Sequence, residues 1–290
     1  LGQYRRAERV YRYVAEKFHG KVIGKECAYR IGDVLSYEKK YDRAAAELEA
    51  AIAEYPEYRL KRPEVTFNLA EAYFWKKNYV RARLNFSLFV KEFPSQTIGA
   101  LAYLRLGEIS EIEKKDAETA KHNYLEAQNL FPFSFGAKLA ELRMARLLIT
   151  SEADFSYQIQ NIEPIYNDVS MSKPVHEIAQ TVFIEYMLAK KDADRAIELS
   201  QKGMVESDGE AYEAFKGFYV RAVGAKLAQL NENKKYPEAI TFYEHEKNWL
   251  SLGDPHNYKV MAEVYRGLGL FETSNKYMSQ YVAELKKRNN

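Results

Sequence analysis

The chain has 290 residues, 47% hydrophobic and 29% charged, which is normal for a folded chain. Its net charge is +2 with both signs interspersed, so no broad positive field is available to attract nucleic acid. No run approaches the roughly 18 consecutive apolar residues of a membrane-spanning helix, and the single Cys27 excludes an internal disulfide.

One short pattern recurs along the chain: an aromatic residue followed three positions later by a small one. Tyr41 precedes Ala44, and Tyr79 precedes Ala82, which lies 38 residues further on. The small position returns at Ala120, Ala196, Ala239 and Ser274, with a gap of two periods before Ala196. The chain is therefore one unit copied about seven times, and periods of this length are typical of repeat architectures.

The pattern predicts fifteen helices and no strand, because apolar residues recur with helical spacing and nothing alternates with period two for long. The first helix, 4–18, stands alone. The pairs that follow are 24–39 with 41–55, 62–77 with 79–93, 97–114 with 116–131, 136–150 with 154–168, 175–190 with 193–206, 210–231 with 237–251, and 256–268 with 270–287.

The residue types within each unit fit two closely packed antiparallel helices. Small side chains permit close approach, with Gly32 and Gly107 on first helices and Ala44, Ala82 and Ala120 on second helices. Prolines end the pairs, because proline cannot continue a helix; they are Pro56, Pro94 and Pro132.

This spacing resembles the tetratricopeptide repeat. The matching positions in one unit are Thr66, Leu69, Ala70, Tyr73, Ala82, Phe86, Phe89 and Pro94. The resemblance implies an all-α, right-handed superhelical solenoid of about seven antiparallel helix pairs, forming a single domain over 1–290. Its parts are a half repeat at 1–20 and repeats at 24–56, 62–94, 97–132, 136–170, 175–208, 210–251 and 254–288.

Two features set parts of the chain apart. The fourth unit has Gln158 at its small position and Pro164 within its second helix, so we expect a kink or a shortened helix there. The chain also begins at Leu1 without a methionine and with an unpaired second helix, so we expect it to be a fragment of a longer protein.

No residue pattern indicates catalysis, a metal or a cofactor. The five histidines are scattered, and no paired His or Cys spacing accompanies them. His245 stands between Glu244 and Glu246, but consecutive helical residues point about 100° apart and cannot converge on one ion. We therefore expect a noncatalytic protein.

The resemblance implies that the first helices line a concave groove that binds a partner. The groove residues it selects are Tyr29, Asp33, Tyr37, Phe67, Glu71, Phe74, Trp75, Glu108 and Ile112. One groove position, at the same place in the first helix of each unit, is acidic in five units: Asp33, Glu71, Glu108, Glu185 and Glu263. Acids flanked by aromatics suit a peptide with apolar or aromatic and basic residues. The alternative is that these acids pair with Lys or Arg on a neighbouring helix.

The leading functional hypothesis is a scaffold that holds a protein or peptide, without nucleic acid. Residues 24–132 resemble repeats of bacterial cell-envelope proteins, which favours a periplasmic, envelope or motility complex. The alternative is a docking arm of an enzyme whose catalytic domain lies outside this chain. Binding of acidic chaperone tails is disfavoured, because Tyr29 and Asp33 replace the Lys and Asn used there. RNA binding is a third hypothesis, disfavoured by the acidic groove positions.

Overall fold

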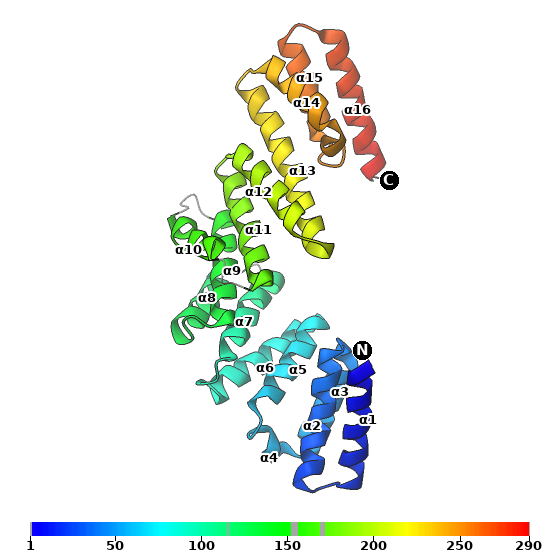
Figure 1. The fold of residues 1–290 in the computed structure, drawn as a ribbon, viewed down its shortest axis with the longest axis vertical. Coiled ribbons are helices and arrows are strands. Elements are labelled where there is room, and N and C mark those ends of the chain that lie inside the picture. The colour runs from blue at the N-terminus through cyan, green and yellow to red at the C-terminus, as the bar shows by residue number, and fades with distance from the viewer. Residues whose placement is uncertain (1, 115, 152–155, 169–171, 290) are drawn as a thin grey trace. The chain divides into compact units, whose positions relative to one another are not determined.

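The computed structural model describes residues 2–114, 116–151, 156–168 and 172–289. These residues form sixteen α-helices and no strand, arranged as successive antiparallel pairs (Figure 1). The prediction of an all-α helical repeat is confirmed. The chain divides into two compact units, unit 1 (residues 1–147) and unit 2 (residues 148–290), which are described separately.

Unit 1 contains the first nine helices, the last of which ends just beyond its boundary. They are α1 (Gly2–Lys17), α2 (Val22–Tyr37), α3 (Tyr41–Glu54), α4 (Pro56–Arg59), α5 (Pro63–Trp75), α6 (Tyr79–Glu92), α7 (Gly99–Lys114), α8 (Ala117–Leu130) and α9 (Phe135–Ser151). The short α4 was not predicted. Pro56 ends α3 as expected, but it also occupies the first turn of α4, where its missing N–H is not needed.

Glycine and alanine permit the close approach of paired helices in unit 1. A Cβ added to Gly32 would lie 2.4 Å from Leu48 Cγ, and one added to Gly107 would lie 2.3 Å from Tyr124 Cε1. Ala44 and Ala82 are fully buried. These contacts confirm the small positions that the sequence predicts, because no larger side chain fits between the two helices.

Aromatic side chains fill the space between the two helices of the α5–α6 pair. The ring of Phe67 packs edge-on against both Phe86 and Phe89, with each pair of centroids 5.7 Å apart. Rings at this separation add to the stabilisation that their burial gives. The same buried cluster extends from Tyr29 on α2 to Ile109 on α7, so adjacent pairs in unit 1 share one core.

Unit 2 repeats this packing with different side chains. Its helices are α10 (Ser156–Asn167), α11 (Lys173–Ala189), α12 (Ala193–Glu206), α13 (Gly209–Glu232), α14 (Tyr236–Leu250), α15 (His256–Gly267) and α16 (Phe271–Asn289). Gly203 on α12 meets the ring of Phe215 on α13. The 24 residues of α13 account for the long 43-residue step of the repeat.

Ser274 takes the small position in the final pair. Its buried hydroxyl donates to the Ala262 carbonyl at 2.7 Å. The second helix of the fourth unit, where a kink or a shortened helix was expected, is α10, and Pro164 lies within it. The side chain of Gln158 lies outside the described residues.

The turn within five of the described pairs has one recurring backbone form. Lys39, Lys77, Lys191 and Lys234 have φ of 59°, 60°, 61° and 57°, in the left-handed region that usually favours glycine. The next residue donates its N–H back to a carbonyl five residues earlier, as in Lys40 N to Leu35 O at 2.9 Å. A left-handed conformation costs a lysine about 1–2 kcal/mol. Gly269 occupies the same position in the last pair without this cost, whereas the four other turns have lysine there.

A matched pair of glycine substitutions tests the packing of the helix pairs. We expect Gly107→Ala to lower the free energy of unfolding by about 1–3 kcal/mol, because its methyl group would overlap the Tyr124 ring. Gly217→Ala on α13 has no neighbour within 4 Å and should raise stability by about 0.5–1 kcal/mol. Urea unfolding measures both. Two substitutions with the same sign of effect would contradict the packing described.

Candidate partner-binding site

Polar side chains connect the first helices of successive pairs in unit 1. Asn68 Nδ2 on α5 donates to Asp33 Oδ1 on α2 at 2.7 Å. Arg105 Nε on α7 donates to Glu71 Oε1 on α5 at 2.7 Å. Arg143 on α9 forms an ion pair with Glu108 on α7, also at 2.7 Å. We call this series, in which an acid on one first helix pairs with a donor on the next, the inter-repeat ladder.

Arg105 is the most heavily engaged member of the ladder. Its guanidinium contacts both oxygens of Glu71, at 2.7 and 3.4 Å, and donates to Glu108 at 2.7 Å. It also lies 4.6 Å from the ring centroid of Phe74 and 5.2 Å from that of Trp75. Burial alone lowers the pKa of Arg105, but the two carboxylates outweigh it and raise the pKa, so the cation is held firmly charged.

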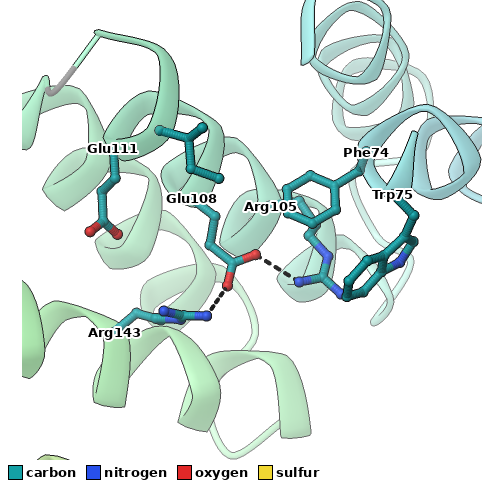
Figure 2. Close-up of a pocket in the computed structure, with 7 residues that line it drawn as sticks. Phe74, Trp75, Arg105, Glu108, Glu111 and Arg143 are labelled. Carbon is teal, nitrogen blue, oxygen red and sulfur yellow. Dashed lines mark hydrogen bonds and ion pairs between the residues drawn. The ribbon is translucent and has the colours of Figure 1, made fainter. Parts of the chain in front are cut away.

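A hollow of about 220 Å³ lies beside Arg105 on the first-helix face. Figure 2 shows its lining, which comes from α5, α7 and α9 and comprises Phe74, Trp75, Arg105, Glu108, Glu111, Ile112 and Arg143. We call this the α5–α7–α9 hollow.

Apolar and charged groups divide the wall of the hollow. Trp75 is 49% exposed and Ile112 is 51% exposed, which is high for such large apolar side chains. Trp75 is nevertheless held in place, because its ring stacks on Tyr41 and its indole N–H donates to Glu71 at 3.0 Å. Preorganised aromatic side chains of this kind are typical binding anchors.

Two charged side chains of the hollow retain bonding capacity. The Arg143 side chain is 44% exposed, and its one ion pair leaves most of its five N–H donors unused among the described residues. Glu111 accepts a hydrogen bond from the Tyr124 hydroxyl, which uses only one of its two oxygens. Burial, together with Glu111, raises the pKa of Tyr124, so this hydroxyl stays a donor.

Four of the predicted groove residues line the hollow together: Phe74, Trp75, Glu108 and Ile112. Glu71 lies behind it, bound to Arg105 and Trp75. Tyr37 is 71% exposed but stacks on Tyr4 and does not line the hollow.

The other three predicted groove residues, Tyr29, Phe67 and Asp33, are buried in unit 1. Tyr29 is fully buried and donates its hydroxyl to the Tyr55 carbonyl at 2.8 Å. Phe67 packs against Phe86 and Phe89 on α6, the second helix of its own pair. Asp33 is only 5% exposed and contacts Asn68 on the next first helix. All three side chains are covered within the stack, so they stabilise it and are not accessible to a partner.

The acidic positions are mostly occupied by partners within the chain. Asp33 contacts Arg62 and Asn68, Glu71 contacts Arg105, and Glu108 contacts Arg105 and Arg143. In unit 2, Glu263 accepts from Asn231 at 3.0 Å. The alternative in which an acid pairs with Lys or Arg on a neighbouring helix is therefore correct for Glu71 and Glu108. Asp33 instead contacts Arg62, just before α5, and Asn68. These three acids of unit 1 offer no free acidic row to a partner.

Three residues of the hollow, Arg105, Arg143 and Glu111, were not among the predicted groove residues. A pattern in the sequence could have revealed the two arginines, since they lie 38 residues apart, one period of the repeat. Each stands about 35 residues after an acidic position of the preceding unit, which is the spacing of neighbouring first helices. Glu111 has no comparable pattern, because its role depends on the hydroxyl of Tyr124 across the helix pair.

Neither metal chemistry nor a membrane span is indicated. Among the described residues, no group of three or more His, Cys, Asp or Glu side chains is arranged to hold a metal ion. In the same residues, no helix combines the length and apolar character needed to cross a membrane.

Successive antiparallel pairs with small residues at their contacts define an all-α helical-repeat protein. Residues 26–58 match the model of the tetratricopeptide repeat family. Residues 26–58 are therefore similar to a tetratricopeptide repeat, and the paired helices of the described residues agree with the fold of that family. No curated protein matches the sequence.

Solved structures agree on the fold. A tetratricopeptide repeat protein from Parabacteroides merdae is 14% identical, with a TM-score of 0.59 over 91% of this chain and 93% of that chain. Human IFIT1, solved as a dimer with PPP-AAAA, is 17% identical, with a TM-score of 0.50 over 97% of this chain and 69% of that chain. At these identities the likeness concerns the fold alone.

The buried carboxyl of Asp33 gives a pH-dependent prediction. Burial raises the pKa of Asp33, while Asn68 and Arg62 oppose the rise without cancelling it. Folded Asp33 therefore binds its proton more tightly than the unfolded chain does, and its contribution to stability decreases as pH rises from about 4 through its folded pKa. Asp33→Asn cannot titrate and serves as the reference.

We expect the wild type to lose stability relative to Asp33→Asn as pH rises over this range. Urea unfolding of both proteins at several pH values measures the difference. A difference that grows in favour of the wild type with rising pH would mean that Arg62 and Asn68 outweigh burial.

Proposed function

We propose that this protein is a noncatalytic scaffold that holds a protein or peptide partner in the α5–α7–α9 hollow. The observation that carries the proposal is the pairing of exposed, preorganised apolar side chains with incompletely used charges in one concave place. Repeat folds of this kind present extended surfaces for binding, which is consistent with a scaffold.

Apolar contact supplies the affinity in this proposal. A partner side chain that enters the hollow covers Trp75 and Ile112, each about half exposed. Trp75 is fixed by Tyr41 and Glu71, so little conformational freedom is lost on binding. An aromatic or branched aliphatic side chain suits this space.

The charged groups of the hollow favour a basic residue next to the apolar side chain of the partner. Three carboxylates, Glu71, Glu108 and Glu111, surround two guanidiniums, Arg105 and Arg143. One carboxylate is therefore in excess, and Glu111 is the one without a cation in the described residues. A lysine or arginine beside the apolar side chain of the partner would pair with it.

Three further hypotheses from the sequence concern RNA binding, a docking arm of an enzyme, and a cell-envelope or motility complex. The IFIT1 structure holds PPP-AAAA, but in the hollow of this chain Arg105 and Arg143 are each paired with a carboxylate, and Glu111 adds a third negative charge that disfavours phosphate. We therefore propose no nucleic-acid site in the hollow. A docking arm of a larger enzyme is compatible with the same hollow. A cell-envelope or motility complex stays a prediction from the sequence, because the comparisons do not bear on the compartment.

Selected peptides test the proposal. Peptides enriched on the immobilised wild-type protein from a random phage-displayed library should share an aromatic or aliphatic residue next to lysine or arginine. We expect Trp75→Ala and Ile112→Ala to raise the Kd of such a peptide about 10- to 100-fold, as for central anchor residues. Fluorescence anisotropy of the labelled peptide measures Kd, and circular dichroism checks the fold.

Two further variants make the test specific. Glu111→Gln should weaken peptides that carry the basic residue and leave those without it unchanged. Val80→Ala on α6, 71% exposed and outside the hollow, is the control and should bind like the wild type. Equal losses in Val80→Ala and Ile112→Ala, or no loss in either hollow variant, would contradict this site.

A further inference from the structure

Lysine pairs occupy the turn between the two helices of most repeats. The described pairs are Lys39–Lys40, Lys76–Lys77, Lys190–Lys191 and Lys234–Lys235, at the α2–α3, α5–α6, α11–α12 and α13–α14 turns. The sequence places another pair, Lys114–Lys115, at the α7–α8 turn, where the side chains lie outside the described residues. A chain of net charge +2 thus concentrates cations at one kind of position.

The backbone of these turns does not require lysine. One lysine of each described pair adopts the left-handed conformation that glycine or asparagine accommodates better. A cation near a helix C-terminus is favourable, and in two of the pairs the other lysine, Lys76 or Lys190, already caps that terminus. In the other two pairs, Lys40 and Lys235 cap the start of the next helix, where the helix dipole does not favour a cation. The recurrence of lysine at the strained position in four repeats therefore points to a use for its side chain.

The left-handed lysines are available for that use. Lys39, Lys77, Lys191 and Lys234 are exposed. Within the described residues none of them has a carboxylate within ion-pairing distance, whereas their neighbours Lys40, Lys76 and Lys235 pair with Glu38, Asp42 and Glu238. The four ammonium groups are free cations in water.

Contacts between turns place the lysines of each unit along one edge. In unit 1, Tyr41 stacks on Trp75 and Lys76 bonds Asp42 at 3.0 Å, which brings the α2–α3 and α5–α6 turns together. In unit 2, Gln229 near the end of α13 donates to the Lys191 carbonyl, and Lys226 bonds Asp194 at 2.6 Å. We call these the lysine edges of unit 1 and unit 2.

Exposed apolar side chains stand beside the lysines. On unit 1 they end the first helices: Tyr37, two residues before Lys39, is 71% exposed, and Trp75, directly before Lys76 and at the rim of the hollow, is 49% exposed. On unit 2, the α15–α16 turn replaces its lysine pair with Leu268, Leu270 and Phe271, which are 40%, 51% and 63% exposed. Lysine interleaved with tyrosine, tryptophan and aliphatic groups is the composition of surfaces that rest on a lipid headgroup layer.

We propose that the lysine edges bind the surface of an anionic lipid bilayer. Spaced ammonium groups match a fluid array of anionic headgroups, and the exposed apolar side chains enter the headgroup boundary. Nucleic acid fits the edges less well, because its fixed phosphates favour bidentate arginine. The four described turns carry ammonium groups and no guanidinium, so they lack the group that binds a fixed phosphate through two hydrogen bonds.

Vesicle binding of the full chain tests the proposal. The wild type should sediment with phosphatidylcholine vesicles that contain phosphatidylglycerol, should not sediment with pure phosphatidylcholine, and should be released by high salt. In the edge variant, Lys39, Lys77, Lys191 and Lys234 are all changed to glutamine. Glutamine keeps the turn geometry as lysine does, and we expect at least a tenfold fall in the partition coefficient.

The control variant removes the same charge elsewhere. Lys21, Lys61, Lys91 and Lys202 are exposed and lie away from the lysine edges, and their change to glutamine should lower the partition coefficient less than threefold. Equal falls in the two variants, or no sedimentation of the wild type with anionic vesicles, would overturn the proposal. So would an edge variant that loses binding to a single-stranded oligonucleotide but keeps its binding to vesicles, which would identify nucleic acid as the ligand.

Discussion

Close approach of two helices at small residues is the constraint on which the rest of unit 1 depends. Gly32 lies against Leu48 and Gly107 against Tyr124, with no space for a further methyl group. Because the helices of each pair are locked at these contacts, the first helices of successive pairs meet in one register. That register brings Arg105 to Glu71 and Arg143 to Glu108, and leaves Tyr124 directed at Glu111.

The inter-repeat ladder then determines what the first-helix face can bind. Charges that the sequence alone presents as a free acidic row are used to join one pair to the next. What remains for a partner is the α5–α7–α9 hollow, where apolar surface and one surplus carboxylate lie together. Structural and binding roles are thus separated by burial: Asp33 is 5% exposed, whereas Trp75 and Ile112 are half exposed.

The repeat was predictable from the sequence because its small residues recur with a fixed period, and Ala44, Ala82 and Gly107 lie where that period requires. The accessible groove was less predictable. Tyr29 and Phe67 share the helix positions of groove residues, yet Tyr55 and Tyr58 cover Tyr29, and α6 covers Phe67. Such coverage depends on side-chain packing that the repeat pattern does not reveal. The arginines escaped notice because their partners lie one repeat away. The short α4 was missed because Pro56 was interpreted only as a helix stop, although proline also fits a helix start.

A double-mutant cycle between Glu71 and Arg105 tests the central claim most directly. The free energy of unfolding would be measured by urea for Glu71→Gln, Arg105→Met and the double variant, with Glu71 and Arg143 as a reference pair that makes no contact. The inter-repeat ladder predicts a favourable coupling energy of about 1–3 kcal/mol for Glu71 with Arg105, and below about 0.5 kcal/mol for the reference pair. A coupling for Glu71 and Arg105 no larger than that of the reference pair would contradict the register from which the hollow is built.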